Sequence, residues 1–226
     1  MKRNVLAGIG ILSVIVAGIG TYEAYRGETP LAVDQVDMLD AAHLVQQAAP
    51  QALLSDTERD ALIYMREEEK LAHDVYTTLG TVWGTRIFSN IAASEATHTE
   101  AVRTLLARYN VADPVVSDSV GVFSNPTFTD LYTKLVAQGS ASLPAALGVG
   151  ATIEDLDLAD LAERLGQTDN ADIITVFQNL ARGSRNHLRS FVGQLESRGG
   201  SYTAQYIQPT ELASIIGSPR ETGATR

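Results

Sequence analysis

Apolar residues recur at helical spacing in four long segments of this chain, and no other feature constrains its fold as strongly. In each segment an apolar side chain returns every three or four residues, so these side chains line one side of a helix. Such a stripe must be buried against other helices. Aromatic residues make up only 6% of the chain, and the alternation of Val, Ile and Tyr that is typical of strands is missing. The pattern predicts an all-α fold with helices over residues 56–79, 87–109, 142–165 and 170–198, the last capped by Asp169.

The connections between the four segments differ in length. About six residues link the first two segments and a short turn links the last two, whereas roughly thirty residues, 110–141, separate the pairs. This long stretch contains prolines and glycines and one short helical piece, about 127–137. Two antiparallel hairpins joined by one long crossover is the connectivity of ferritin-like four-helix bundles. We therefore expect such a bundle over residues 55–199, starting at a capping box formed by Ser55 and Glu58.

The N-terminus has the pattern of a targeting segment. Lys2 and Arg3 precede an uncharged run of 16 residues, Val5 to Gly20, whereas a spanning helix needs about 20 residues. Residues 1–20 are therefore expected to be a signal peptide or a membrane anchor, and both alternatives stay open. Residues 21–54 are expected to form a tether and residues 200–226 a partly apolar tail. This arrangement predicts an extracytoplasmic protein, whether periplasmic, secreted or membrane-anchored.

Charge and cysteine content exclude several classes of function. The chain has 17 Lys and Arg against 27 Asp and Glu, a formal net charge of −10. Phosphate backbones would repel such a chain, so nucleic acid is not expected as a partner. The chain has no cysteine, which excludes disulfides, thiolate zinc sites, iron–sulfur clusters and a cysteine nucleophile. The acidity suits a protein that handles cations.

Ionisable residues interrupt the apolar stripes of three segments. In the second segment Glu95 and His98 are three residues apart, which places a carboxylate and an imidazole on one face of the helix. Glu154 and Asp157 lie in the middle of the stripe of the third segment, and His187 lies at the edge of the stripe of the fourth. Each of these helices therefore offers at least one metal-ligating group to the interior.

The first segment carries the run Glu67-Glu68-Glu69. Glu68 and Glu69 flank the apolar stripe, whereas Glu67 is expected to point outward. Arginines could neutralise buried acids, but most of them are expected to project outward, namely Arg66, Arg103, Arg108, Arg164 and Arg185. Burying ionised carboxylates without partners is costly, so converging charges of one sign predict bound cations. Taken singly, the same groups have ordinary alternatives: a solvated charged face for the glutamates and a hydrogen-bonded core position for His187.

Four stretches of the sequence are specific enough to compare with known families: residues 64–76, 90–98, 150–157 and 183–188. They resemble a bacterial and archaeal family that is catalogued as a domain of unknown function and grouped with the ferritin-like superfamily. The resemblance covers about residues 55–198. It implies the ferritin-like fold and a dinuclear metal centre. Rubrerythrins and ferritin-like oxidases repeat Glu-x-x-His on the last helix, but Ser184 stands where that glutamate would be. We expect Asp157 to replace it.

With this replacement the inventory of ligands equals that of di-iron carboxylate bundles, four carboxylates and two histidines. The expected ligands are Glu69 (or Glu68), Glu95, His98, Glu154, Asp157 and His187. Glu95 or Glu154 is expected to bridge two metal ions, with His98 and His187 as terminal ligands. Tyr76 follows Glu69 by seven residues on the same face and is a candidate catalytic residue that donates a hydrogen bond or an electron; core packing is its alternative role.

Oxygen and nitrogen ligands without thiolate favour two iron ions, with manganese or zinc as alternatives. The expected reaction is oxidation of Fe(II) by dioxygen or peroxide, with an external reductant. The rival hypothesis is a non-catalytic metal-binding or scaffold module with a single structural ion. A purely structural bundle would require every buried acid to be neutral or paired. Whether the chain forms a homo-oligomer stays open.

Overall fold

The computed structural model describes residues 53–223, and this part of the chain is all-helical, with six α-helices and no strand. The expected all-α class is therefore confirmed. None of the helices in this part is long and apolar enough to cross a membrane. The expected leader and nearly all of the tether lie outside the described residues. The helices are α2 (Asp56–Trp83), α3 (Arg86–Arg108), α4 (Pro126–Gly139), α5 (Leu143–Leu165), α6 (Ala171–Glu196) and α7 (Pro209–Gly217).

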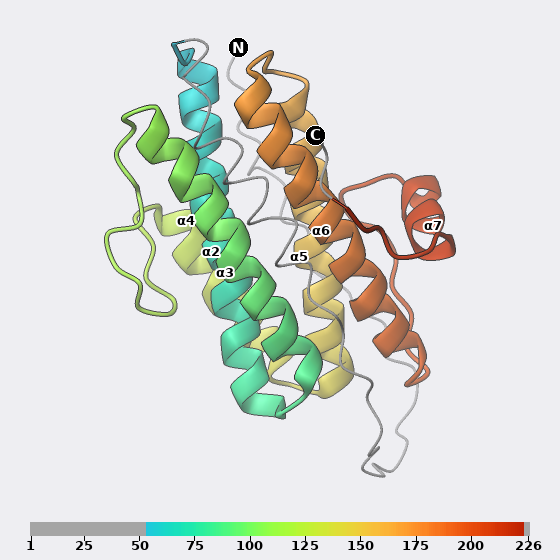
Figure 1. Cartoon of the computed structure of the whole chain (residues 1–226). Coiled ribbons are helices and arrows are strands. Elements are labelled where there is room, and N and C mark those ends of the chain that lie inside the picture. Colours follow the sequence, from blue (N-terminus) through green and yellow to red (C-terminus); the bar gives the residue numbers. More distant parts are fainter. Residues whose placement is uncertain (1–52, 224–226) are drawn as a thin grey trace.

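The four long helices pack side by side as two hairpins (Figure 1). Two residues, 84–85, join α2 to α3, and five residues, 166–170, join α5 to α6. The two hairpins face one another through contacts of α2 with α5 and of α3 with α6. In Figure 1 α3 and α5 run in the same direction, so the connection between them crosses the length of the molecule. The long connection, which contains α4, thus lies where the sequence predicted it.

The ends of the helices agree with the sequence at one position and differ at two. Ser55 forms the expected capping box: its Oγ accepts from the N–H of Glu58, and its own N–H donates to the Glu58 carboxylate. The expected end of the first helix near Gly80 is wrong. α2 continues to Trp83 and ends at Gly84, whose φ of 64° is left-handed. Gly80 instead allows close packing, because a Cβ there would lie 3.2 Å from the Cβ of Phe88. Asn170, rather than Asp169, caps α6.

Tightly packed aromatic rings fill the interior between the hairpins. The ring of Phe191 lies 5.1 Å from that of Tyr76 and 5.6 Å from that of Phe88, measured between centroids. All three side chains are fully buried. Gly150 on α5 faces the same cluster, and a Cβ at this position would lie 2.5 Å from the Phe191 ring. This packing brings α5 close to α2 and α6 one helical turn before Glu154.

The crossover covers the face of α2 that the sequence assigned to solvent. Arg66 donates with Nε and Nη2 to Asp113, at 3.1 Å in both cases. Glu67 accepts hydrogen bonds from the backbone N–H groups of Ser124 at 2.6 Å and Asn125 at 3.1 Å. Both side chains are buried. The expectation that Arg66 and Glu67 point outward was therefore wrong, because a helical wheel of one segment cannot include a loop that folds over its outer side.

Asp155 anchors the segment that follows α6. It is fully buried on α5 and accepts hydrogen bonds from the backbone N–H groups of Gln205 at 2.6 Å, Tyr206 at 3.3 Å and Ile207 at 2.8 Å. The Tyr202 hydroxyl donates to it at 2.7 Å. A single carboxylate thus satisfies four donors of an irregular segment that would otherwise lie against the protein without partners.

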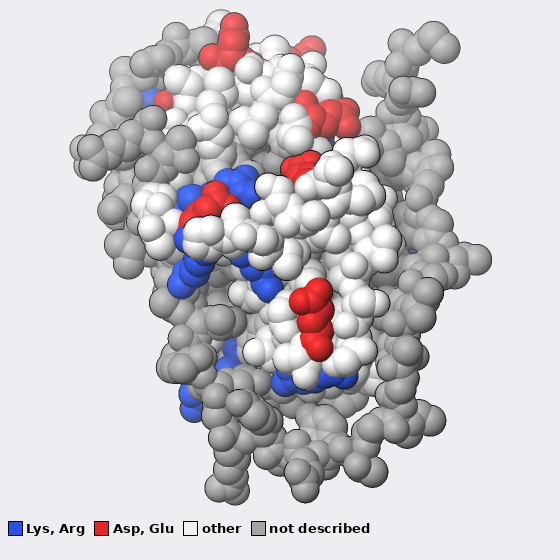
Figure 2. Space-filling view, turned by 90° about the vertical axis from the view of Figure 1, so that its right-hand side faces the viewer, with Lys and Arg blue, Asp and Glu red and all other residues white. Residues whose placement is uncertain are grey.

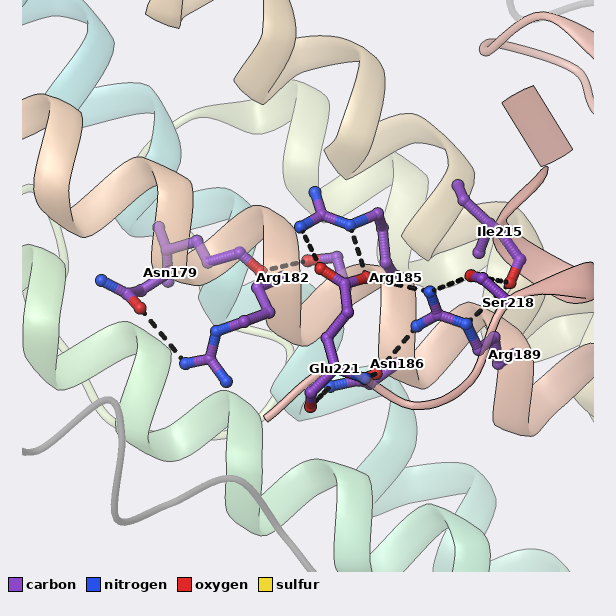
Figure 3. A network of polar contacts seen from close by, with 10 residues as sticks. Asn179, Arg182, Arg185, Asn186, Arg189, Ile215, Ser218 and Glu221 are labelled. Atoms are coloured by element: carbon purple, nitrogen blue, oxygen red, sulfur yellow. Dashed lines mark hydrogen bonds and ion pairs between the residues drawn. The ribbon is translucent and has the colours of Figure 1, made fainter. Parts of the chain in front are cut away.

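The C-terminal segment is held against α6 by charge. Arg185 donates to both carboxylate oxygens of Glu221, at 2.8 and 2.6 Å, and Arg189 donates to one of them at 2.9 Å (Figure 3). The hydrogen bonds from Arg185 lower the pKa of Glu221 to about 2. Basic and acidic side chains accordingly lie next to one another on the face that carries α7 (Figure 2). The tail is therefore part of the folded domain.

Replacing Asp155 with Asn should lower the free energy of unfolding by about 1–3 kcal/mol, because the amide NH₂ must face a backbone N–H that now lacks an acceptor. Chemical denaturation measures this change, and limited proteolysis should show earlier cleavage between residues 200 and 208. The matched control is Asp169→Asn, a change at an exposed acid next to a helix start. Equal stability of both variants would contradict the anchoring role of Asp155.

Candidate metal centre

Five of the expected ligands converge from the four long helices. Glu69 lies on α2, Glu95 and His98 lie on α3, Glu154 lies on α5 and His187 lies on α6. Each is buried, and His98 has no exposed surface at all. The spacing of Glu95 and His98 turns both side chains toward the centre of the bundle, where α2, α5 and α6 supply one group each.

These residues form two groups that share one member. In the first group the Nδ1 of His98 lies 2.8 Å from Glu95 Oε2 and 3.2 Å from Glu69 Oε2. In the second group the Nδ1 of His187 lies 2.7 Å from Glu95 Oε1 and 3.6 Å from Glu154 Oε2. Within each group, one ligand atom of every residue lies within 4.8 Å of the others. Glu95 therefore directs one carboxylate oxygen at each histidine, which is the arrangement of a bridging carboxylate between two neighbouring positions.

Several buried atoms of the two groups have no hydrogen-bond partner. They are Glu69 Oε1 and His98 Nε2, together with Glu95 Oε1 and His187 Nδ1, which lie 2.7 Å from one another as an ion pair without hydrogen-bond geometry. A buried polar atom without a partner costs about 1–3 kcal/mol, and so many at one place are unusual in a folded protein. Carboxylate oxygens and imidazole nitrogens are also the ligands that iron, manganese and zinc accept. The residues present therefore fit a pair of metal ions.

The histidines supply the positive charge that the carboxylates need in the metal-free protein. Burial alone would lower the pKa of His187, but the Glu95 and Glu154 carboxylates raise it to about 9. The pKa of His98 is likewise raised well above its usual value by Glu95 and Glu69, against the effect of burial. Burial raises the pKa of Glu69 to about 7. Burial would also raise the pKa of Glu95, but the two histidines hold it below its usual value.

Two further side chains orient the expected ligands. The Tyr76 hydroxyl donates to Glu154 Oε1 at 2.6 Å and also lies 3.3 Å from the Gly150 carbonyl oxygen. The Nε2 of His187 lies 3.1 Å from Ser94 Oγ, which turns its Nδ1 toward Glu95. Such contacts behind a ligand fix its orientation and affect metal affinity. Tyr76 therefore contacts an expected ligand directly, and its role as an electron donor stays a prediction.

Asp157 and Glu68 do not join either group. Asp157 Oδ2 accepts a hydrogen bond from Ser184 Oγ at 2.5 Å, and its Oδ1 is buried without a partner. Ser184, the residue at the position of the expected second glutamate, is thus in contact with the proposed replacement. Burial and the charge of Glu69 raise the pKa of Asp157 well above its usual value. Of the two adjacent glutamates, the structure brings Glu69 and not Glu68 to the histidines.

Comparison with known proteins confirms the part of the resemblance that concerns a domain family of unknown function. A family model described as an uncharacterized protein domain, DUF2202, matches residues 58–219. The chain belongs to this family. Uncharacterized protein MJ0754 of Methanocaldococcus jannaschii is 55% identical over 177 residues, which cover 78% of this chain and 96% of the relative. The crystal structure of hypothetical protein MJ0754 from Methanococcus jannaschii DSM 2661 is similar with a TM-score of 0.76 at 54% identity, over 77% of this chain and all of that one.

Two residues beside the ligand groups were not identified as functional positions by the sequence analysis. Ser94 was not singled out, although its Oγ lies 3.1 Å from His187 Nε2. Gly183 lies in the middle of α6, opposite His98, and a Cβ there would lie 2.6 Å from both Cε1 and Nε2 of that ring. A glycine inside a long helix costs helix stability, and this cost was the available signal for a close approach.

Gly183→Ala should displace the His98 ring and remove metal from the group that contains Glu69, while the chain stays helical. The matched control is Gly193→Ala on the same helix, where an added Cβ meets nothing within 4 Å. The control should keep its full metal content and gain about 0.5–1 kcal/mol of stability, the usual gain of Ala over Gly in a helix. Metal analysis and circular dichroism measure the two effects. Equal metal content in both variants would contradict the contact with His98.

Metal binding should release protons, and apparent affinity should rise with pH. In the metal-free protein Glu69 is protonated below about pH 7 and His187 below about pH 9, and a metal ion must displace these protons. The affinity should therefore increase between about pH 6 and 9, and the raised pKa of His98 should extend the increase further. Calorimetric titration in buffers of different ionisation enthalpy counts the protons. His187→Gln should weaken the pH dependence between about pH 7 and 9, and a pH-independent affinity would argue against these groups as ligands.

Proposed function

We propose that this DUF2202 protein is a ferritin-like metal-binding protein with a dinuclear carboxylate–histidine centre that oxidises Fe(II) with dioxygen or peroxide. The observation that carries the proposal is the position of Glu95, which belongs to both ligand groups and directs one oxygen at each histidine. A carboxylate in this position can bridge two metal ions. Glu69 and His98 would complete one position, and Glu154 and His187 the other.

The topology supports the assignment to ferritin-like bundles. Two helical hairpins joined by a long connection, with ligands from all four long helices, match the architecture of di-iron carboxylate proteins. In those proteins two of the helices each carry Glu-x-x-His. Here α3 carries it, and α6 has Ser184 and His187 instead. Asp157 lies outside both groups but stays the candidate for the remaining carboxylate, because it contacts Ser184 and its buried Oδ1 has no partner.

The residues of the chain would bind, orient and shield the metal ions. Tyr76 and Ser94 hold Glu154 and His187 in place through hydrogen bonds. The rings of Phe88 and Phe191 pack beside Tyr76 and keep water away from this side of the centre. Two bound iron ions would supply electrons to dioxygen or peroxide, with manganese or zinc as alternative occupants. Because the chain has no cysteine, electrons for a second turnover would come from a separate reductant. From the targeting pattern at the N-terminus we also propose that this activity lies outside the cytoplasm.

A non-catalytic module with one structural ion is the second candidate. It is favoured by one observation: Asp157 lies outside both groups, so that five residues rather than six converge. One of the two positions would then bind a metal ion too weakly to be occupied. The number of metal ions per chain and the consumption of oxygen separate the two candidates, because a structural ion is not oxidised.

The test is anaerobic loading of the metal-free protein with Fe(II), followed by metal analysis and measurement of oxygen uptake. The intact protein should bind two iron ions and consume oxygen. His98→Ala should lose one ion, and Glu95→Ala should lose tight binding at one position at least, both with unchanged helicity. His73→Ala is the matched control, because His73 is partly exposed and contacts Asp74 rather than the centre. Unchanged metal content in both ligand variants would refute the proposal. Binding of one ion without oxygen uptake would favour the non-catalytic module with one structural ion.

A further inference from the structure

The part of α6 that carries His187 is made of poor helix formers. Residues 183–190 include one glycine, two serines, one asparagine and His187 itself, all of which rank below alanine and leucine in helix propensity. Both serine hydroxyls donate to the carbonyl oxygen four residues earlier, a contact that slightly destabilises a helix. The glycine is required at its position, because a Cβ at Gly183 would lie 2.6 Å from the His98 ring. The expected ligand His187 therefore lies on a stretch of helix that its own sequence supports weakly.

The C-terminal segment is bound to the outer side of this stretch (Figure 3). Asn186 exchanges two hydrogen bonds with the backbone of Glu221, because its Nδ2 donates to the carbonyl oxygen and its Oδ1 accepts from the N–H, both at 3.0 Å. The Glu221 carboxylate accepts from Arg185 at 2.8 and 2.6 Å and from Arg189 at 2.9 Å. Glu221 thus binds three residues that lie within two positions of His187 in the sequence.

Arg189 ties a longer part of the C-terminal segment to the same stretch. Its Nε donates to the carbonyl oxygen of Ile215 at 2.7 Å, and its Nη2 donates to Ser218 Oγ at 2.8 Å. The end of α7 and the residues after it are therefore fixed to α6 at the level of His187. No other part of the described chain makes as many printed side-chain hydrogen bonds to the outer side of residues 183–190.

On the inner side, the same stretch is held through His187. Its Nδ1 lies 2.7 Å from Glu95 Oε1, and its Nε2 lies 3.1 Å from Ser94 Oγ, both on α3. The side chain of His187 is 9% exposed, whereas those of the other four residues in the two ligand groups are 2% exposed or less. His187 is thus the group nearest to the surface, where local opening of a helix would affect the metal position first.

We propose that Glu221 is a positioning residue for His187: by binding the outer side of residues 185–189 it fixes the metal position that is formed by Glu95, Glu154 and His187. The C-terminal segment and a bound metal ion act on opposite sides of one weak stretch of helix. Each therefore favours the arrangement that the other binds, and the coupling is reciprocal. Stabilisation of the stretch by Glu221 stands on the hydrogen bonds alone, whereas the effect on metal binding rests on the proposed function.

Hydrogen exchange of the full-length metal-free protein tests the first part. In Glu221→Gln the amides of residues 184–190 should exchange about 10-fold faster, because hydrogen bonds between charged groups are lost. The amides of residues 173–180 should keep their exchange rates. The matched control is Glu211→Gln, which removes the same charge from an exposed residue of α7 and should leave both stretches unchanged. Unchanged exchange of residues 184–190 in Glu221→Gln, or equal acceleration along all of α6, would overturn the proposal.

Anaerobic calorimetric titration with Fe(II) tests the second part. His187→Ala identifies the binding step that belongs to His187, and Glu221→Gln should weaken the same step by about 10-fold while the other step keeps its affinity. Adding Glu221→Gln to His187→Ala should have no further effect on the remaining step, because the two residues act on one position. Equal weakening of both steps, or of neither, would overturn the positioning role.

The two experiments separate this proposal from the proposed function. If the intact protein bound no Fe(II), the proposed function and the effect of Glu221 on metal would both fail, and hydrogen exchange would still decide whether Glu221 stabilises the stretch. If two ions were bound equally tightly in the intact protein and in Glu221→Gln, the dinuclear centre would stand and the positioning role would be refuted.

Discussion

Like charges buried between helices are the constraint on which the rest of this structure depends. Glu69, Glu95, Glu154 and Asp157 are all buried in the bundle, where repulsion between charges is less screened than in water. Within the described residues the cationic groups that face them are His98 and His187. Repulsion between these carboxylates therefore destabilises the folded bundle in the metal-free protein. Apolar packing around Phe88 and Phe191 must then hold the helices together. A ligand that binds only this folded arrangement would stabilise it by mass action.

The same residue type serves two purposes, and its neighbours decide which. A carboxylate that accepts hydrogen bonds from backbone N–H groups has its partners, and these bonds hold an irregular segment against a helix. Glu67 does this for the crossover and Asp155 for the segment after α6. A carboxylate that faces another carboxylate, as Glu154 faces Glu95, has an unfavourable charge that the single hydroxyl donor Tyr76 does not neutralise. Burial alone therefore does not mark a ligand; a shortage of protein donors beside other carboxylates does.

Much of this arrangement could be predicted from helical periodicity alone. The stripes revealed the four long helices, the long connection and the convergence of Glu95 and His98, because these depend on residues within one helix. Periodicity could not show that α2 runs past Gly80, since that glycine serves a contact with Phe88 on another helix. It also could not place Asp157, whose partner Ser184 lies 27 positions away on α6. Contacts between helices were the missing information in both cases.

The run Glu67-Glu68-Glu69 shows why such information matters. Three consecutive charges on a helix usually form a solvated face, but here all three are buried. Successive residues of a helix are rotated by about 100°, so the three side chains point to three sides of α2. Glu67 faces the crossover, Glu68 faces α5 and Glu69 faces His98 on α3. Because α2 is covered on all three sides, each glutamate meets a different neighbour: backbone donors, other carboxylates or an imidazole. One short charged run thereby supplies an acceptor that holds the crossover, a buried acid that faces α5 and a candidate ligand of the dinuclear centre.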